Sequence, residues 1–338
     1  MKAAVMHEVG KPLRIEDVPM PEIGPEEVLV QTRSCGICRT DLHILMGFGY
    51  VPPLPHILGH EPAGVIAKVG SKVTHLRPGD RVVPHLFFTC GTCYYCRVGR
   101  DQQCANLKGI LGVLSPGAFA DYFKAPAGNL FVLPDKIPFD VGGLVADAVV
   151  TSVHAIKRAN LRLQDSAVVI GAGGIGQVLI QILRAAGVAV IAVSRSDAKL
   201  RLAKECGAHL VVRSGDPKVA ETIREFSGTG GAQCVFDCVG AAQTMRDAAD
   251  YVMRCGRIIV VGEERDYPTI NTTEIAQREL EIVGSRNGTR QETLEAIRLL
   301  EAGIVSPPIA RRFTLDEINT AYDAVRQGAS ARVVIVME

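Results

Sequence analysis

The fold of this chain is decided by the stretch Ser166-Ala167-Val168-Val169-Ile170-Gly171-Ala172-Gly173-Gly174-Ile175-Gly176. Its first five residues form an apolar run typical of a strand buried on both faces of a parallel sheet. Apolar residues then recur at helical spacing through Val178, Leu179, Ile182 and Leu183. A G-x-G-x-x-G turn between a strand and a helix predicts a dinucleotide-binding fold, because its backbone can approach a pyrophosphate at the helix N-terminus.

This turn supplies the first candidate cofactor-binding residues. We expect the cofactor to contact Gly171, Gly173, Gly174, Ile175 and Gly176. The alternative is a glycine-rich turn that serves only the close packing of the helix against the strand.

The next predicted strand, 188–193, bears on the choice of cofactor, because it ends in Ser194-Arg195-Ser196. A site selective for NAD usually has an acidic residue at this place, which binds the ribose 2′-hydroxyl. A serine followed by an arginine suits a 2′-phosphate instead, and Lys199 follows closely. We therefore expect NADP, with NAD possible. The alternative is that Arg195 is merely solvated and Asp197 binds the ribose.

The remaining patterns predict two domains of different kinds. Further strands at 234–239 and 257–261 alternate with helical stretches, so 151–287 should form a doubly wound parallel sheet. Up to about residue 133 the chain instead has short β-like runs broken by Gly and Pro, typical of a barrel-like β domain with its polar motifs in loops. We expect this catalytic domain to span 1–150 and to be completed by 288–338, where a helix at 291–300 and a strand at 331–336 are predicted.

Four cysteines close together form the strongest metal signal in the chain: Cys90, Cys93, Cys96 and Cys104. Four thiolates can close a tetrahedron around zinc and leave no open position, which predicts a structural metal. An iron–sulfur cluster and disulfides are the alternatives. A bound zinc ion would stabilise a loop that has little apolar core of its own.

A second metal signal lies in Cys35-Gly36-Ile37-Cys38-Arg39-Thr40-Asp41-Leu42-His43 together with Gly59-His60-Glu61. A catalytic zinc needs three protein ligands and an open fourth position. Cys38 and His60 can supply two ligands, while Asp41 and Glu61 are candidates for the third ligand or for its surroundings. The alternative is a reduced cysteine and a hydrogen-bonded histidine in a β-rich fold.

Composition excludes several classes of function. Hydrophobic residues make up 47% of the chain and charged residues 22%, as in ordinary globular proteins. The net charge of +1 gives no electrostatic footprint for nucleic acid or for an anionic membrane. We find no signal peptide and no apolar run of membrane-spanning length, so we expect a cytoplasmic protein whose clustered cysteines serve metal binding.

In order and spacing, these motifs resemble the zinc-dependent medium-chain alcohol dehydrogenases over essentially the whole chain. The resemblance implies a GroES-like β-barrel domain plus a Rossmann domain. It also implies that Cys38 and His60 bind the catalytic zinc and that Glu61 can approach the metal when water leaves. Many relatives have a cysteine as third ligand where this chain has Asp147, and a branch similar to bacterial secondary alcohol dehydrogenases uses aspartate there. A helix cap is the alternative role for Asp147.

The same resemblance implies roles for neighbouring residues. Thr40 resembles the hydroxyl that takes the substrate proton, and His43 the far end of a relay through the cofactor ribose to solvent. Asp41 would orient His60. The resemblance places pyrophosphate contacts at Arg39 and Arg332, and the substrate pocket at Leu86, Ile110 and Phe119. We expect further cofactor contacts at Ser194, Arg195, Ser196, Lys199, Val239 and Val261. Core packing explains the three pocket residues equally well.

We therefore expect a dehydrogenase that transfers hydride between a primary or secondary alcohol, or its aldehyde or ketone, and NADP(H), with two zinc ions per chain. A polyol or L-threonine-type zinc dehydrogenase is the related alternative. A non-catalytic, zinc-stapled dinucleotide-binding protein is the alternative of another class. The expected partners are a small-molecule alcohol or carbonyl compound and further copies of the chain, as a tetramer or a dimer, without nucleic acid or membrane.

Overall fold

The computed structural model describes residues 1–337 and divides the chain into two compact units. Unit 1 comprises Met1–Val150, Thr289–Ala302 and Ile309–Glu338, and unit 2 comprises Thr151–Gly288 and Gly303–Pro308. The chain thus leaves unit 1 twice, after Val150 and after Ala302, and returns to it each time. Gly288 and the short piece 303–308 lie with unit 2, although all of 288–338 was predicted to belong to the first domain.

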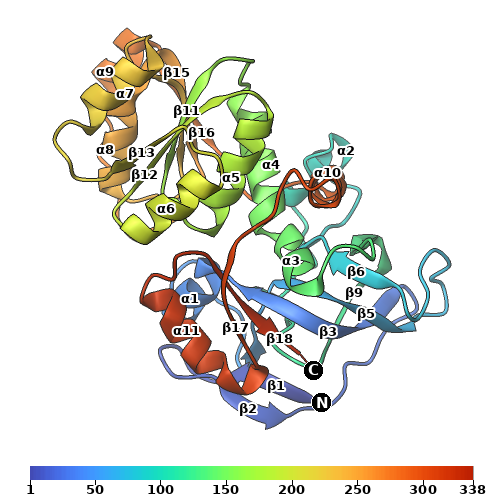
Figure 1. Ribbon diagram of the computed structural model, residues 1–338. Helices are drawn as coiled ribbons and strands as arrows, with labels where there is room; N and C mark the ends of the chain where they lie inside the picture. Colours follow the sequence, from blue (N-terminus) through green and yellow to red (C-terminus); the bar gives the residue numbers. More distant parts are fainter. Residues whose placement is uncertain (338) are drawn as a thin grey trace. The chain divides into compact units, whose positions relative to one another are not determined.

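Unit 2 is built on a six-stranded parallel sheet in the order β13-β12-β11-β14-β15-β16 (Figure 1). The strands are β11 Ser166–Ile170, β12 Ala189–Ser194, β13 Leu210–Arg213, β14 Ala232–Asp237, β15 Val252–Val260 and β16 Glu281–Gly284. The helices are α5 Gly174–Ala185, α6 Asp197–Glu205, α7 Val219–Ser227, α8 Ala242–Tyr251 and α9 Thr272–Arg278. Strand order reverses beside β11, the first strand, which is where open parallel sheets bind ligands at their carboxyl edge.

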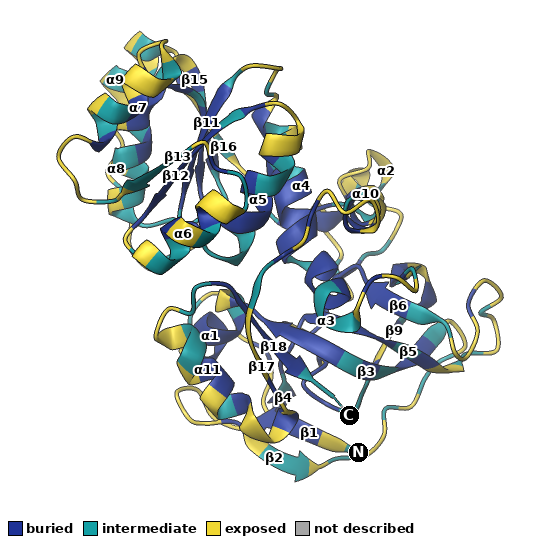
Figure 2. Ribbon diagram, viewed as in Figure 1, coloured by how far each residue is buried: buried dark blue, intermediate teal, exposed yellow. Residues whose placement is uncertain are grey.

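Both faces of this sheet are buried, which explains the uninterrupted apolar runs in its strands (Figure 2). Residues such as Val169, Val190 and Phe236 pack toward α5 and α6. Their neighbours along the strands, such as Val168 and Val235, pack toward α7 and α8 on the other face. The doubly wound sheet predicted from the sequence is confirmed.

Unit 1 is rich in short strands. Its seven-stranded sheet has the order β10-β6-β5-β3-β18-β17, with β9 also pairing with β3, and smaller sheets join β2-β1-β4 and β7-β8. The strands are β1 Lys2–Met6, β2 Arg14–Asp17, β3 Glu27–Ile37, β4 His56–Ile57, β5 Glu61–Val69, β6 Arg81–Pro84, β7 Phe87–Phe88, β8 Gly109–Ile110, β9 Tyr122–Pro126, β10 Leu130–Val132, β17 Ile309–Phe313 and β18 Arg332–Val336.

Short helices and turns carry the polar motifs of unit 1 between these strands. They are α1 Arg39–Leu45, α2 Tyr94–Arg97, α3 Phe139–Gly142, α10 Arg290–Glu301 and α11 Ile318–Arg326, with 3₁₀ turns η1 Asp101–Gln103, η2 Ala127–Asn129, η3 Gly143–Ala146 and η4 Leu315–Glu317. Helix α4, Ala148–Ala159, carries the chain onward into unit 2. The last strand, β18, pairs antiparallel with the end of β3, where Val333 faces Ile37.

Among the described residues, no single helix has both the length and the apolar character needed to cross a membrane. One pair of short helices, Phe139–Ala146 and Ala148–Ala159, meets that test only when both are counted together across a 43° bend.

Candidate metal centres and dinucleotide-binding edge

Four predicted ligands converge in unit 1: Cys38, His60, Glu61 and Asp147, which we name the Cys38 cluster. One ligand atom from each lies within 4.8 Å of the others. Cys38 Sγ is 3.2 Å from Asp147 Oδ2, and His60 Nε2 is 4.0 Å from the same oxygen. The four residues come from three separate parts of the chain, so the fold itself brings them together.

Strand pairing explains this convergence. Cys38 directly follows β3, and Glu61 opens β5 opposite Gly36 of β3. A Cβ atom on Gly36 would lie only 2.1 Å from Glu61 Oε2, so glycine is needed there to admit the carboxylate. Asp147 lies between η3 and α4, in non-helical backbone at φ −132° and ψ −69°.

Asp41 holds the imidazole of His60 in position. Its Oδ1 lies 3.2 Å from His60 Nδ1, and its Oδ2 accepts a hydrogen bond from the Cys38 backbone N–H at 2.9 Å. The Asp41 side chain is completely buried. A carboxylate on Nδ1 leaves Nε2 as the nitrogen able to bind a metal, which is the arrangement that ligating histidines usually have.

The donor set of the Cys38 cluster fits a zinc ion. A thiolate, an imidazole and a carboxylate are all normal zinc ligands. With Zn–S near 2.3 Å and Zn–O or Zn–N near 2.1 Å, neighbouring donors of a tetrahedral site lie roughly 3.4–3.6 Å apart. The separations of 3.2 Å and 4.0 Å to Asp147 Oδ2 bracket this range. Three ligands with Glu61 beside them leave room for an exchangeable fourth ligand.

Arg332 is the cation that contacts the acidic groups of this cluster. Its Nη2 lies 2.9 Å from Glu61 Oε1 and 3.3 Å from Asp147 Oδ2. Burial raises the pKa of Glu61 to about 8, against the opposing effect of Arg332. The pKa of Asp147 is lowered because the charges of His60 and Arg332 outweigh its burial. Arg332 thus offsets part of the negative charge gathered at this cluster.

The residues predicted to move protons lie on α1, next to the Cys38 cluster. Thr40 Oγ1 is 3.7 Å from Cys38 Sγ. His43 is buried and lies edge-to-face with Phe48, with ring centroids 5.0 Å apart. Thr40 and His43 are three residues apart on one helix and so share a face. Arg39 is exposed at the first position of the same helix.

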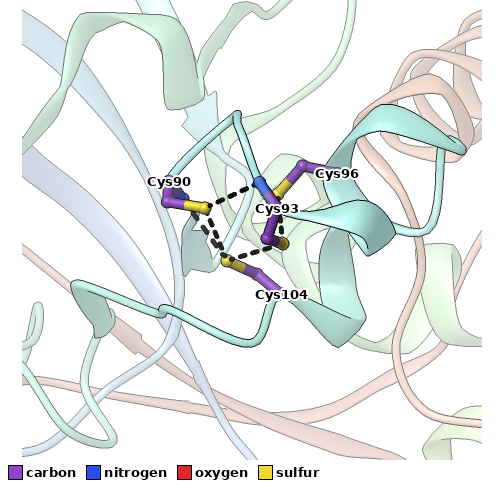
Figure 3. Close-up of side chains that lie close together, drawn as sticks. All are labelled: Cys90, Cys93, Cys96 and Cys104. Carbon is purple, nitrogen blue, oxygen red and sulfur yellow. Dashed lines mark hydrogen bonds between the residues drawn. The ribbon is translucent and has the colours of Figure 1, made fainter.

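The four cysteines at 90–104, named here the four-cysteine loop, lie with their sulfur atoms together (Figure 3). The Sγ–Sγ separations are 3.5 Å for Cys93 and Cys96, 3.5 Å for Cys90 and Cys104, and 3.9 Å for Cys93 and Cys104. A tetrahedron with Zn–S bonds of about 2.3 Å has edges of about 3.8 Å. All four side chains are free thiols, so the arrangement fits a closed tetrathiolate zinc site.

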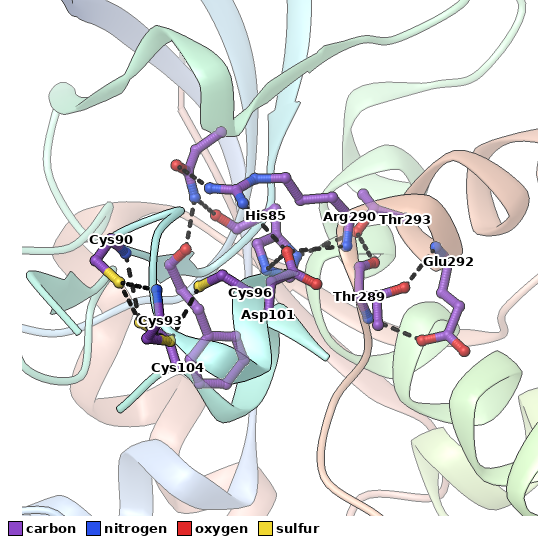
Figure 4. A network of polar contacts seen from close by, with 12 residues as sticks. His85, Cys90, Cys93, Cys96, Asp101, Cys104, Thr289, Arg290, Glu292 and Thr293 are labelled. Carbon is purple, nitrogen blue, oxygen red and sulfur yellow. Dashed lines mark hydrogen bonds and ion pairs between the residues drawn. The ribbon is translucent and has the colours of Figure 1, made fainter. Parts of the chain in front are cut away.

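Sequence reasoning missed a polar network beside this loop (Figure 4). Asp101, three residues before Cys104, lies 3.2 Å from Arg290 Nη1 at the start of α10. Arg290 Nη2 donates to Asn129 Oδ1 at 3.2 Å, and Asn129 Nδ2 donates to the carbonyl oxygen of His85 at 2.9 Å. His85 Nδ1 is 3.3 Å from Thr293 Oγ1. These partners are up to 208 residues apart and form no local motif.

In unit 2 the glycine-rich turn has the geometry that a dinucleotide site requires. Gly171 follows β11 with φ +91°, which favours glycine, and α5 begins at Gly174. A Cβ atom on Gly176 would lie 2.2 Å from the Gly171 carbonyl oxygen, so only glycine allows helix and turn to approach this closely. A Cβ atom at Gly173 would meet nothing within 4 Å. The turn is therefore open at Gly173 beside the N-terminus of a twelve-residue helix.

The other predicted cofactor residues of unit 2 lie at the same carboxyl edge, whereas Arg39 and Arg332 belong to unit 1. Ser194 ends β12, and the Ser196 hydroxyl caps α6 by accepting from the Lys199 backbone N–H. Val239 and Val261 follow β14 and β15. The buried Asp237 carboxylate accepts from the backbone N–H groups of Val239 and Gly240 at 2.9 and 3.0 Å, which shapes that turn. Burial raises the pKa of Asp237.

The three residues predicted to line a substrate pocket belong to the hydrophobic core of unit 1. Phe119 is completely buried and packs edge-to-face against Tyr322, with centroids 6.1 Å apart. Leu86 and Ile110 adjoin the β7–β8 pair. Core packing, the alternative left open above, accounts for the burial of all three, and a pocket role stays a prediction.

A parallel dinucleotide fold and a β-rich unit with two sets of metal ligands define the class of zinc-binding dehydrogenases. Residues 24–135 match the alcohol dehydrogenase GroES-like domain, and residues 174–302 match the zinc-binding dehydrogenase domain. An alcohol dehydrogenase of Geobacillus stearothermophilus is 35% identical over 341 residues, covering all of both chains. The chain belongs to the zinc-dependent medium-chain alcohol dehydrogenase family, as the resemblance predicted.

Other relatives differ in the substrate or cofactor that their names carry. An L-threonine 3-dehydrogenase of Chelativorans sp. is 31% identical, covering 99% of this chain and 98% of its own. The alcohol dehydrogenase of Aeropyrum pernix superposes with a TM-score of 0.93 at 33% identity, covering 99% and 100%. An NAD-dependent alcohol dehydrogenase superposes at 0.94 with 29% identity over both whole chains. A protein of Sinorhizobium meliloti 1021 bound to NADP superposes at 0.88 with 30% identity, covering 99% and 98%.

Proposed function

We propose that this protein is an NADP-linked alcohol dehydrogenase that interconverts small primary or secondary alcohols with aldehydes or ketones. The observation that carries the proposal is the convergence of Cys38, His60 and Asp147 on one point, with Glu61 and Thr40 beside it. A non-catalytic dinucleotide-binding protein has no need of this set. We also propose that each chain binds two zinc ions, one at the Cys38 cluster and one in the four-cysteine loop.

Each residue of the Cys38 cluster then has a defined task. Cys38, His60 and Asp147 would hold the catalytic zinc, Asp41 would keep His60 oriented, and Glu61 would remain beside the metal. When bound, zinc supplies Lewis-acid polarisation of the substrate oxygen, and the nicotinamide supplies or accepts the hydride. Thr40 Oγ1 would exchange a proton with the substrate oxygen, and the cofactor ribose would pass that proton to His43, which would exchange it with solvent.

The cofactor assignment rests on the carboxyl edge of unit 2. The glycine-rich turn and the N-terminus of α5 would hold the pyrophosphate. Pyrophosphate contacts by Arg39 and Arg332 stay predictions. The adenosine ribose would be surrounded by Ser194, Arg195, Ser196 and Lys199. Two of these residues are cations that can bind a 2′-phosphate, and β12 ends in a serine rather than an acidic residue. Val239 and Val261 would line the same edge.

An L-threonine or polyol substrate is the second candidate, because relatives at 31% identity carry such names. These reactions share the zinc and the dinucleotide and differ in the substrate pocket, for which we propose Leu86, Ile110 and Phe119. Assembly into dimers or tetramers and a cytoplasmic location remain predictions.

The first test combines metal analysis with cofactor oxidation. We expect two zinc ions per chain and faster oxidation of NADPH than of NADH with ketones or aldehydes. Cys38→Ser and His60→Ala should each lose one zinc ion and at least about a thousandfold in turnover, while NADPH binding stays within about twofold. Cys255→Ser, at an exposed thiol, is the control. One zinc ion per wild-type chain without turnover would contradict the proposal, whereas preferred oxidation of L-threonine would favour the second candidate.

A further inference from the structure

The edge strand of the unit 2 sheet ends in an arginine beside the predicted ribose site. Arg213 is the last residue of β13, and Ser194 is the last residue of β12. The two strands pair in parallel with Ser194 opposite Arg213, and the Ser214 backbone N–H donates to the Ser194 carbonyl at 2.9 Å. Neighbouring strands lie about 4.8 Å apart and residues in register point to the same face. Arg213 is thus adjacent to the residue that marks the ribose position.

The same arginine accounts for Asp197, the alternative ribose ligand of the sequence analysis. Asp197 Oδ1 accepts from Arg213 Nη1 at 2.5 Å. Asp197 is also the first residue of α6, where the helix dipole favours a carboxylate. The acidic residue of an NAD site is found at the end of the second strand, here β12, and Asp197 lies three positions beyond that end. Asp197 therefore has two structural partners, the helix and Arg213, without any ribose.

We propose that Arg213 is a further specificity-determining residue, which binds the 2′-phosphate of NADP together with Arg195, and that Asp197 is its counter-ion. This inference rests on the NADP part of the proposed function. The Asp197 and Arg213 side chains are 66% and 59% exposed, and exposed ion pairs of this kind are weak. A phosphate carries more charge than a carboxylate and has three acceptor oxygens, so it can take the guanidinium from Asp197.

This exchange predicts how the two cofactors are distinguished. NADPH gains the guanidinium of Arg213, while NADH leaves Arg213 paired with Asp197. The carboxylate of Asp197 competes with the phosphate for the same donor, so its removal should favour NADPH. Asp197 therefore pairs with Arg213 only while no 2′-phosphate is bound.

The experiment isolates the 2′-phosphate by calorimetric titration of the zinc-loaded protein with 2′,5′-ADP and with 5′-ADP, alongside NADPH and NADH. Arg213→Ala should weaken binding of 2′,5′-ADP and NADPH roughly tenfold and leave 5′-ADP and NADH within about twofold. Asp197→Asn should tighten NADPH binding about two- to fivefold. Arg162→Ala removes an exposed arginine before the amino end of β11, at the opposite edge of the sheet, and should change none of the four affinities.

The outcomes separate this inference from the proposed function. If the wild-type protein prefers NADPH and Arg213→Ala keeps that preference, the inference is wrong while the cofactor assignment stands. If Asp197→Asn weakens NADH at least tenfold and spares NADPH, Asp197 binds the ribose and the inference is wrong. If the wild-type protein binds 5′-ADP as tightly as 2′,5′-ADP and prefers NADH, the NADP assignment fails and the inference fails with it.

Discussion

At the scale of single residues, one missing side chain makes room for the Cys38 cluster. A Cβ atom on Gly36 would lie 2.1 Å from Glu61 Oε2 and 2.8 Å from Leu144 Cδ2. Leu144 is completely buried, and the Glu61 carboxylate is paired with Arg332. Neither neighbour can yield to an added methyl group without losing contacts.

Gly36→Ala should therefore lower the free energy of unfolding by about 1–3 kcal/mol and weaken zinc binding at the Cys38 cluster. Denaturant unfolding and metal analysis after dialysis against a chelator measure the two effects. Gly128→Ala is the matched control, because a Cβ atom there meets nothing within 4 Å. Equal stability of the two variants would show that the Glu61 side chain can move away from the added methyl group without loss of stability.

Buried His85 makes stability depend on pH. Burial, reinforced by the charge of Arg290, lowers its pKa to about 3, below the usual value near 6.5. The unfolded chain therefore binds a proton between these values that the folded chain does not. The contribution of His85 to stability is complete above about pH 6.5 and is lost as the pH falls toward 3.

When the pH falls from about 7.5 to about 5.5, the free energy of unfolding of the wild-type protein should drop by about 1 kcal/mol more than that of His85→Gln. Asp101 Oδ2 lies 3.6 Å from His85 Nε2, and the charges of Arg290 and Glu292 act on the pKa of His85. The variant keeps all three residues. Denaturation midpoints at both pH values measure the difference, with His75→Gln at an exposed position as control. Parallel pH profiles for wild type and His85→Gln would contradict a proton-free His85.

At the scale of elements, the pattern of apolar residues predicted a strand well where both faces of that strand are buried. The apolar run 166–170 coincides with β11 because both faces of that strand are covered. Strand β15 begins at Val252, earlier than the apolar run 257–261 predicted. The apolar pattern missed the first part of the strand, because that part contains exposed residues and Cys255 at φ +57°. Residue type and spacing singled out Cys38, His60 and the four cysteines as candidate metal ligands, whereas Asp147 came only from the family resemblance. The Asp101 network and the Arg213–Asp197 pair were not, because they depend on how distant segments pack.

Asp101 links the four-cysteine loop to α10. A substitution of Asp101 should therefore reduce the local stability of both elements. Its side chain is 10% exposed and lies against the first residue of α10. Asp101→Asn should lower stability by about 1–3 kcal/mol and accelerate amide hydrogen exchange in the first turn of α10 and in residues 90–104. Asp135→Asn, in an exposed pair with Arg81 at 3.7 Å, should cost at most about 0.5 kcal/mol. Unchanged exchange in α10 would mean that the helix is held without Asp101.

At the scale of the whole molecule, the candidate metal ligands and the glycine-rich turn lie in different units. Both clusters of metal ligands lie in unit 1, and the glycine-rich turn lies in unit 2. The sequence analysis predicted this division because the cysteine motifs and the glycine motif lie in separate stretches. It could not place 303–308 with unit 2, since no composition change marks that piece.

Hydrogen exchange mapped over the full chain tests the division directly. NADPH should slow exchange at 172–177 and 195–199 and leave the four-cysteine loop unchanged. A thiol-competent zinc chelator should accelerate exchange at 90–104 and 290–294 and leave β11 and β14 protected. Loss of protection in β11 on chelation would show that the metals also support the dinucleotide fold.

The discontinuity of unit 1 has a consequence for how the protein is made. Translation delivers Cys38, His60, Glu61 and Asp147 well before β18, the second strand that pairs with the end of β3. That strand also carries Arg332, the counter-charge of Glu61 and Asp147. During synthesis these carboxyl groups therefore remain without their arginine until Arg332 is made, 185 residues after Asp147. A zinc ion bound before then would supply positive charge in its place.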